Sequence, residues 1–429
     1  MSMIPISQIE RTTILKLTRR FAPFLVICYF FTYIDRVNLG FAASSMEREL
    51  HFSATLFSQA AGIFFWTYFL FEIPSNLVLA RVGARKWIAR IMMSWALVSA
   101  STAWISSETG LLILRALLGA AEAGFFPGVI YFLTLWFPAA YRSRILGWFL
   151  FAVPASSVLG APLSYWLLNH PPIFGLAGWR LLFVAEALPC LILSVIVWFY
   201  LTDRPADADW LTDEERHWLA KRLDEDAERS GVFNSKSLFQ VLSDPRVLSL
   251  GLVYGGIVAG LYGLGFFLPQ IVEGFGRAIG STGWFIAAPY AIAAIGMVLW
   301  ARSADGSGRY RRATIVAIGA MAIGLGMASL TDAPLGKMAA ITIATIGCFS
   351  ALPVFWVLPT AFLSGAAAAS GIALINSIGN LAGYFGPTIM GVTKDLTGDY
   401  NDGLMVLAGL AALSGALVAG MRLQPKETA

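Results

Sequence analysis

The chain has 429 residues, of which 57% are hydrophobic and only 13% are charged, and its mean hydropathy is +0.70. Soluble globular domains carry about 25% charged residues, so this composition excludes a soluble protein and indicates a membrane protein. The formal net charge of +4 does not point to a nucleic-acid partner, because the basic residues gather at the ends of apolar stretches.

Twelve apolar stretches of roughly 20 residues, the length that crosses a hydrocarbon core as an α-helix, follow one another along the chain. They are predicted at about 21–44, 57–79, 88–107, 111–137, 145–168, 180–201, 246–272, 283–302, 312–332, 336–363, 368–392 and 402–421. The first stretch follows a polar, basic segment and carries no small-residue cleavage site, which predicts a retained helix and not a signal peptide. The expected fold class is therefore an all-α membrane protein with twelve transmembrane helices.

Most of the 30 Lys and Arg residues fall in segments that alternate along the predicted helices, before the first, after the second and after the eighth among them. Loops rich in Lys and Arg stay on the cytoplasmic side of a membrane. The sequence therefore predicts that both termini are cytoplasmic, in the inner (plasma) membrane of a bacterium.

The only long polar stretch of the sequence, TDRPADADWLTDEERHWLAKRLDEDAERSG, lies between the sixth and seventh predicted helices. Thr212 and Glu215 have the spacing of a capping box, and the apolar residues that follow form a stripe, which predicts a cytoplasmic amphipathic helix at about 213–229. We expect an N-terminal six-helix bundle (1–201), a cytoplasmic linker with this helix (202–245) and a C-terminal six-helix bundle (246–429).

Cysteine and histidine usage argues against several chemistries. Cys28, Cys190 and Cys348 lie in predicted helices at no metal-like spacing, and the three histidines lie in loops. No nucleophile and base stand together in the predicted spans. The sequence therefore predicts no metal, no cofactor and no enzymatic activity.

Two cytoplasmic turns repeat each other: ARVGARKW follows the second helix and ARSADGSGRYRR follows the eighth. They resemble the two copies of the loop motif of the major facilitator superfamily, G-x-x-x-D-R-x-G-R-R. The second copy keeps the acid as Asp305, whereas the first has Ala80 at the position where aspartate is usual. The resemblance implies a gating role for four residues of these turns: Arg81, Arg85, Asp305 and Arg309.

Within that superfamily the chain is similar to the anion:cation symporter family, which includes permeases for phthalate, tartrate, hydroxyphenylacetate and sugar acids. Five stretches in order carry this similarity: YIDRVNLG, WTYFLFEIPSNLVLARVGARKWI, RALLGAAEAGFFPGVIYFLTLWFP, DRPADADWLTDEER and FWVLPTAFLSGAAAASGIALINSIGNLAGYFGP. The resemblance implies two pseudo-symmetric six-helix bundles and proton-coupled uptake of an organic anion.

Asp35 and Arg36 stand side by side inside the first predicted helix. A charge at the centre of a spanning helix costs about 2.5–3.5 kcal/mol, so such residues face a cavity or a partner. Helical neighbours point about 100° apart, so the two side chains should have different roles. We expect Arg36, with Tyr33 one turn earlier, to hold the substrate carboxylate. The alternative is that Arg36 neutralises Asp35 or caps a carbonyl.

Arg115 and Glu122 lie seven residues apart on one face of the fourth helix. Asp35 and Glu122 are the expected proton carriers, with Arg115 as the charge partner of Asp35. The alternative is a permanent ion pair between Asp35 and Arg115. The resemblance implies that Asp35 and Glu122 couple transport to protons. The spacing of these residues alone does not imply this.

The C-terminal half carries almost no charge in its spans, so it must contribute aromatic faces and hydrogen bonds. The resemblance also places a substrate-contacting aromatic residue at Tyr68 in the second helix. The remaining expected substrate-binding residues are Tyr254, Tyr262, Trp356, Asn376 and Asn380. Each of these could instead pack or hydrogen-bond between helices.

Taken together, these features predict a monomeric symporter that carries a small organic carboxylate and protons inward by alternating access. The alternatives are a transporter-like sensor of carboxylates and an organic-anion exchanger without proton coupling. A monocarboxylate or small dicarboxylate with a hydroxylated or aromatic body is the favoured class of substrate.

Overall fold

The computed structural model describes residues 8–173, 175–230, 244–275, 279–360 and 365–421. Apart from one isolated β-bridge, their regular structure is helical. The helices of the N-terminal half are α1 (Gln8–Leu50), α2 (Ala54–Val82), α3 (Ala84–Ser101), η1 (Thr102–Trp104), α4 (Glu108–Glu122), α5 (Phe125–Trp136), α6 (Ala139–Leu168) and α7 (Gly178–Tyr200). The linker contains η2 (Pro205–Asp207) and α8 (Asp213–Ser230). The C-terminal half contains α10 (Pro245–Glu273), α11 (Ile279–Ser307), α12 (Tyr310–Ser329), α13 (Pro334–Phe355), α14 (Val357–Thr360), α15 (Gly365–Thr397) and α16 (Asn401–Gly420).

Each of the twelve predicted spans coincides with a helix or with a helix pair, so the predicted fold class is confirmed. The fourth span is divided into α4 and α5, and the tenth into α13 and α14, and neither break was predicted. Among the described residues, nine stretches are long and apolar enough to cross a membrane by length and composition alone. The other three spans contain the charged and polar side chains of α1, α3 and α15, and two of these helices supply site residues.

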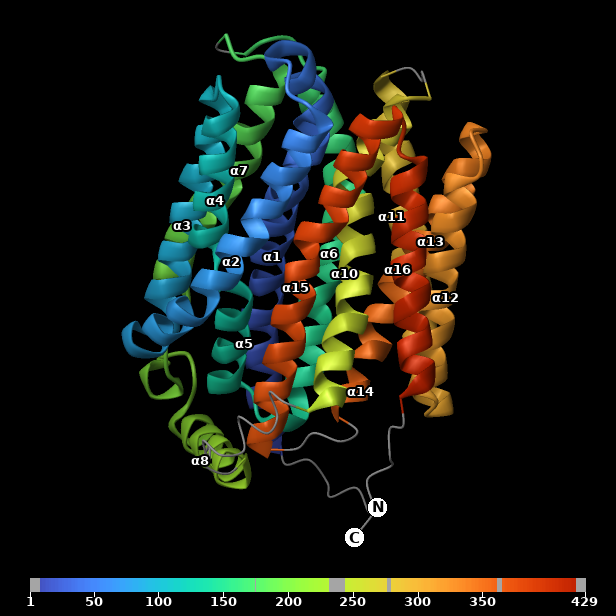
Figure 1. Ribbon diagram of the computed structural model, residues 1–429. Helices are drawn as coiled ribbons and strands as arrows, with labels where there is room; N and C mark the ends of the chain where they lie inside the picture. The colour runs from blue at the N-terminus through green and yellow to red at the C-terminus, as the bar shows by residue number, and fades with distance from the viewer. Residues whose placement is uncertain (1–7, 174, 231–243, 276–278, 361–364, 422–429) are drawn as a thin grey trace.

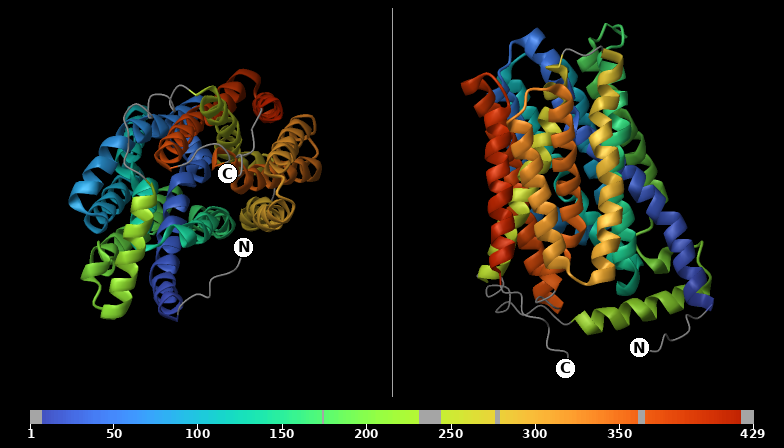
Figure 2. Two further views of the ribbon diagram at one scale, coloured as in Figure 1. Left: turned by 90° about the horizontal axis from the view of Figure 1, so that it is seen from below. Right: turned by 90° about the vertical axis from the view of Figure 1, so that its right-hand side faces the viewer.

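The two halves lie on opposite sides of the molecule when it is seen along the bundle (Figure 2). The start of α1, the end of α16 and the helix α8 lie at the same end of the bundle (Figure 1). Helices α1 and α10, α2 and α15, and α6 and α11 pack against each other between the halves. A site at the centre of the bundle is therefore shared by both halves.

Hydrogen bonds join the halves toward the end of the bundle that lies away from α8. The backbone N–H of Thr55, at the start of α2, donates to Asp395 Oδ2 at 2.7 Å. The hydroxyl of Tyr165, near the end of α6, donates to Glu273 Oε1 at 2.7 Å. All four residues lie at helix ends that point away from α8, so these bonds close the bundle at that end.

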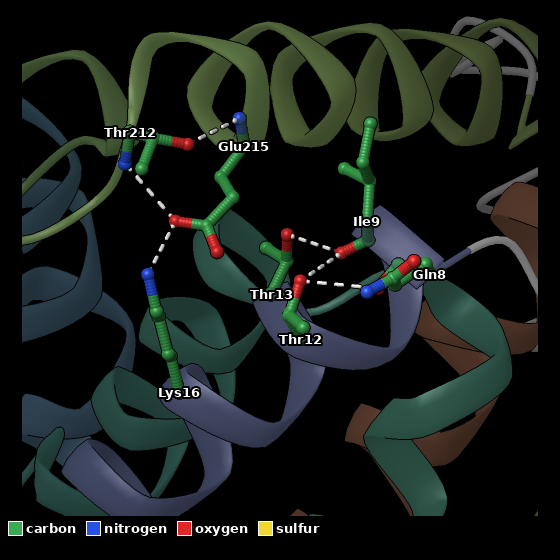
Figure 3. Close-up of polar contacts among 7 residues, drawn as sticks. All are labelled: Gln8, Ile9, Thr12, Thr13, Lys16, Thr212 and Glu215. Atoms are coloured by element: carbon green, nitrogen blue, oxygen red, sulfur yellow. Dashed lines mark hydrogen bonds and ion pairs between the residues drawn. The ribbon is translucent and has the colours of Figure 1, made fainter.

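Helix α8 lies across the opposite end of the bundle (Figure 2). The capping box predicted from the sequence is present: Thr212 Oγ1 accepts a hydrogen bond from the Glu215 backbone N–H at 3.2 Å, and the Glu215 carboxylate accepts one from the Thr212 backbone N–H at 3.0 Å. The same carboxylate forms an ion pair with Lys16 Nζ at 2.8 Å (Figure 3). Glu215 therefore both starts α8 and ties it to α1.

Glu215→Gln should loosen α8 from the N-terminal half. Burial raises the pKa of Glu215, but the hydrogen bonds and charge of Lys16 and Thr212 outweigh burial, and the net pKa is lowered from 4.5. The ion pair is therefore complete above about pH 4.5 and is lost as the pH falls through the lower, folded-state pKa. Lys16 is 44% exposed, and a pair open to solvent on one side contributes about 0.2–1 kcal/mol, so amide hydrogen exchange in α8 should accelerate up to about fivefold.

Glu214→Gln is the matched control, because Glu214 is the exposed neighbour in the same helical turn. Relative to the intrinsic exchange rate at each pH, exchange in α8 should also rise at acid pH in the parent and in Glu214→Gln, and stay unchanged in Glu215→Gln. If all three proteins exchange α8 at the same rate, the contact with Lys16 does not hold the helix.

Candidate functional site

Arg36 lies at the centre of the bundle and contacts both halves. Its side chain is 8% exposed. Nη1 donates to the hydroxyl of Tyr262 in α10 at 3.1 Å, and Nη2 forms an ion pair with Glu122 at the end of α4. Arg36 thus joins α1, α4 and α10. The alternative that it neutralises its neighbour Asp35 is wrong in this structure.

The position of Glu122 follows from a break in the fourth span. Gly124 has φ +91°, a left-handed conformation that favours glycine, and it separates α4 from α5. A Cβ on Gly124 would lie 2.3 Å from Ser75 Oγ, so the close packing there also excludes a side chain. Glu122 is consequently the last residue of α4, where the helix dipole disfavours a negative charge. The guanidinium of Arg36 compensates that charge.

Asp35 points away from Arg36, as the spacing predicted. It is 2% exposed, and it accepts hydrogen bonds from Asn38 Nδ2 at 2.9 Å and from the Ser99 hydroxyl in α3. The alternative of a close ion pair between Asp35 and Arg115 is not seen: no such pair within 4.0 Å occurs in the described part of the chain. The two charges still interact at longer range.

Arg115 is fully buried and is held by different groups from those predicted. Its Nε donates to the Ala60 carbonyl in α2 at 3.2 Å, and its guanidinium lies 5.3 Å from the centre of the Phe64 ring. The guanidinium of Arg36 lies 5.4 Å from the same ring and 5.6 Å from the ring of Tyr68. Phe64 therefore stands next to both buried arginines. Sequence reasoning missed it, although it lies one turn before Tyr68.

The predicted tyrosines line this centre. Tyr33 is buried, and its ring lies 6.4 Å from that of Tyr29. The ring of Tyr262 stands edge to face against Phe65 at 4.6 Å. The phenol of Tyr262 is thus fixed by an aromatic contact while its hydroxyl accepts from Arg36.

The other predicted residues of the C-terminal half form a second group one or two turns away along α10. Tyr254 packs edge to face on Trp356 at 4.9 Å, and Trp356 lies at the break between α13 and α14. Asn376 and Asn380 are half-buried on α15. Between them, Gly379 approaches the ring of Tyr254 so closely that a Cβ would lie 1.9 Å away. The structure therefore brings Tyr254 and Trp356 together and packs α15 against Tyr254 at Gly379.

A small cavity of about 20 Å³, enough for about one water molecule, lies between α1, α6, α10 and α11. Tyr33, Ser156, Ser164 and Tyr290 are among the residues that line it. Of the predicted substrate-binding residues, only Tyr33 contributes to this cavity. The cavity in this conformation thus lies beside the Arg36 and Glu122 pair and not around it.

The turn between α2 and α3, which contains the first copy of the motif, has an acid that its motif lacks. Gly83 has φ +101° between α2 and α3, and Asp203, after α7, accepts a hydrogen bond from the Arg85 backbone N–H at 2.8 Å. Arg85 Nε lies 3.7 Å from the second oxygen of Asp203. Asp203 thus supplies, from another part of the chain, a negative charge at the start of α3. Arg81 is exposed at the end of α2.

The second turn contains Gly308 with φ +64°, which ends α11. Asp305 accepts a hydrogen bond from the Tyr310 hydroxyl at 2.9 Å, and Arg309 is the N-cap residue of α12. Arg311, which was not predicted, donates to the Val418 carbonyl at 3.1 Å and to the Ala419 carbonyl. It therefore fastens this turn to the end of α16.

Asp203→Asn should slow transport without weakening substrate binding, because the contact lies at the turn and not at the centre of the bundle. The substitution removes the charge that faces Arg85 and the positive end of α3, an interaction of about 0.3–1 kcal/mol. Initial uptake rates and binding affinity in the same preparation measure the difference. Asp209→Asn, an exposed acid of the same linker, is the control. A variant with lost affinity and normal maximal rate would contradict a role in the turn.

Two bundles of six membrane-crossing helices around a buried ionic centre that both halves share define a membrane transporter. The chain belongs to the Major Facilitator Superfamily, whose family model matches residues 25–387. The resemblance found in the sequence motifs is thereby confirmed, and the family is one of transporters and not of enzymes.

Similar proteins agree with this assignment. A protein of Agrobacterium vitis named "Putative tartrate transporter" is 47% identical over 96% of this chain and 91% of its own length. A protein of Acinetobacter baumannii named "Quinolone resistance transporter" is 39% identical over 93% of this chain and 92% of its own length. The partially occluded, inward open structure of the xylose transporter XylE from E. coli covers 96% of this chain and 99% of its own with a TM-score of 0.77, and at 15% identity it shows the fold alone.

Proposed function

We propose that the protein takes up a small organic carboxylate together with protons, as a monomer working by alternating access. The observation that carries this proposal is the guanidinium of Arg36, which is held between Glu122 of one half and Tyr262 of the other. A planar guanidinium binds carboxylates through two parallel hydrogen bonds. The Agrobacterium vitis relative, named for a dicarboxylate, supports this class of substrate.

Glu122 and a substrate carboxylate compete for the same cation. While Glu122 is ionised, it occupies Arg36. When Glu122 takes up a proton it loses the charge that holds it there, and the guanidinium becomes available to the substrate. Proton binding therefore precedes or accompanies substrate binding, and loss of the proton returns Glu122 to Arg36 and displaces the substrate. The two ligands are coupled through one side chain.

The closed end of the bundle is the periplasmic one in this proposal, and the end with α8 is cytoplasmic. The Lys and Arg residues of the two motif turns and of the start of α1 lie at the α8 end, as the positive-inside rule requires. An anion that enters a negative-inside cell pays about 2.3 kcal/mol per charge per 100 mV. More than one proton per monoanion would reverse that cost, and Asp35 is the second acid available beside Glu122.

Uptake by the purified protein in sealed vesicles tests the proposal, with labelled tartrate as the first probe and other carboxylates after it. Acid outside should drive accumulation above the external concentration, and a proton ionophore should abolish it. Exchange that ignores the pH gradient would instead indicate an organic-anion exchanger. Binding without movement of label would indicate a sensor, and either result overturns the proposal.

A further inference from the structure

Glu186 is a buried acid of α7 that neither the sequence motifs nor the site described above includes. It is 2% exposed. Its Oε1 accepts a hydrogen bond from the Ser164 hydroxyl in α6 at 2.6 Å, whereas its Oε2 has no hydrogen-bond partner in the described part of the chain. An ionised carboxylate with one bare, buried oxygen is very unfavourable. A proton on Oε2 removes that charge.

In the described part of the chain, no cation is found to interact with Glu186 and stabilise an ionised form. Helix α7 packs against α1, α3, α6 and η1, and η1 contains no charged residue. From α6 it receives the Ser164 hydroxyl, and the one charged group described as interacting with it is Asp35 of α1, an acid. From α3, Trp95 lies beside Cys190, which is one turn further along α7. Two carboxylates near each other in a buried region cannot both be ionised without a large cost. The proton states of Glu186 and Asp35 are therefore linked.

Ser164 connects Glu186 to the cavity between the halves. Its side chain is among those that line the cavity, together with Tyr33 of the central site. A serine hydroxyl can donate one hydrogen bond and accept others at the same time. Here it donates to Glu186 and leaves its acceptor positions for water or a ligand in the cavity. A path for protons from the cavity to Glu186 thus needs only one intervening side chain.

We propose that Glu186 is a third proton-binding group of the transport cycle, which exchanges its proton with the cavity through Ser164. This inference rests on the proton coupling proposed above. In the conformation seen here, closed at the end away from α8, Glu186 holds its proton while Asp35 is free to ionise. When the proton leaves Glu186 for the cavity, Asp35 is driven to take one up, and when that proton comes from the opposite side the pair passes one proton inward while its own proton content stays the same. This is the proton beyond that of Glu122 that inward movement of an anion requires.

The test combines infrared spectroscopy with transport by the full chain in vesicles. The parent should show a carbonyl band of a protonated carboxylic acid that is absent from Glu186→Gln and that changes when substrate is added. Glu186→Gln should keep counterflow, yet a one-unit pH gradient should concentrate substrate about tenfold less, because one proton carries about 1.4 kcal/mol across it. Glu49→Gln is the control, since Glu49 is an exposed acid that contacts Trp179 of the same helix.

Ser164→Ala keeps the acid and removes only the hydrogen bond from the hydroxyl. Its carbonyl band should shift to higher frequency, and uptake should be slower with the same final accumulation. If Glu186→Gln does not fold, the carbonyl band and the uptake rate of Ser164→Ala test the role of Glu186 instead. A missing band in the parent, or a band that ignores substrate in both the parent and Ser164→Ala, overturns the inference. If the parent itself does not concentrate substrate, the proposed function fails, while the response of the band still decides the role of Glu186.

Discussion

Replacing Arg36 with lysine should weaken carboxylate binding at least about tenfold, a loss of about 1.4 kcal/mol, while the protein remains folded. Lysine keeps one positive charge near Glu122, so the buried acid is not left alone. It lacks the planar fork that binds a carboxylate through two parallel hydrogen bonds, and it cannot reach Glu122 and Tyr262 together with the geometry seen for Arg36. Binding to the purified variant, across a panel of carboxylates at acid pH, measures the effect.

Arg36→Ala is less informative, because the removal of one partner of a buried ion pair typically costs about 3–5 kcal/mol and can unfold the protein. Arg180→Lys is the control for Arg36→Lys, since Arg180 pairs with Glu49 at the end of α1, away from the central site. Tyr262→Phe should lower affinity less than Arg36→Lys, because it removes one hydrogen bond from Arg36 and keeps the guanidinium itself. Affinity that is unchanged in Arg36→Lys would exclude Arg36 as the carboxylate site.

The helices and the buried charges could be predicted because both are local properties of the sequence. Each span is a run of apolar residues, and a charge inside such a run stands out. The different directions of Asp35 and Arg36 followed from helical geometry, and the structure confirms that they contact different helices. Glu186 could have been found in the same way, since it is a glutamate in the middle of a predicted span.

The pairing of those charges could not be predicted from spacing along a helix. Arg36 and Glu122 meet because α4 ends at Glu122, just before Gly124, and because α1 presents that face to α4, and both facts belong to the tertiary structure. From the sequence alone, without these two facts, Asp35 and Arg115 were the expected charge partners. Asp203 shows the same limit: it replaces an acid that is missing from the first turn motif, but it lies 118 residues after Arg85 in sequence.

The contacts of Asp35 indicate what Asp35→Asn should do. Asp35 is held by Ser99 and Asn38 and does not contact Arg115, so the substitution removes no hydrogen bond from that arginine. Both hydrogen bonds end on Oδ1, and the amide oxygen of asparagine can accept both. Folding should therefore survive, and the variant tests the role of Asp35 in proton transport instead of its role in stability.

Glu122→Gln should separate substrate exchange from proton-driven accumulation. Glutamine imitates the protonated acid: it has a similar size, carries no charge, and no longer competes with a substrate carboxylate for Arg36. The variant should bind substrate with an affinity that depends less on pH and should exchange it across the membrane in counterflow. One proton across a one-unit pH gradient supplies about 1.4 kcal/mol, so the loss of that proton should lower accumulation about tenfold.

Counterflow and gradient-driven accumulation, measured in the same vesicles for the parent, Glu122→Gln and Asp35→Asn, provide the test. Glu72→Gln is a matched control, because Glu72 is another buried acid but is not hydrogen-bonded to Arg36 in the structure. Normal accumulation in Glu122→Gln would show that the ion pair with Arg36 serves packing alone, and coupling would then rest on Asp35. Accumulation that falls in Glu122→Gln while counterflow continues would instead follow from one cation shared in turn by a protein carboxylate and a substrate carboxylate.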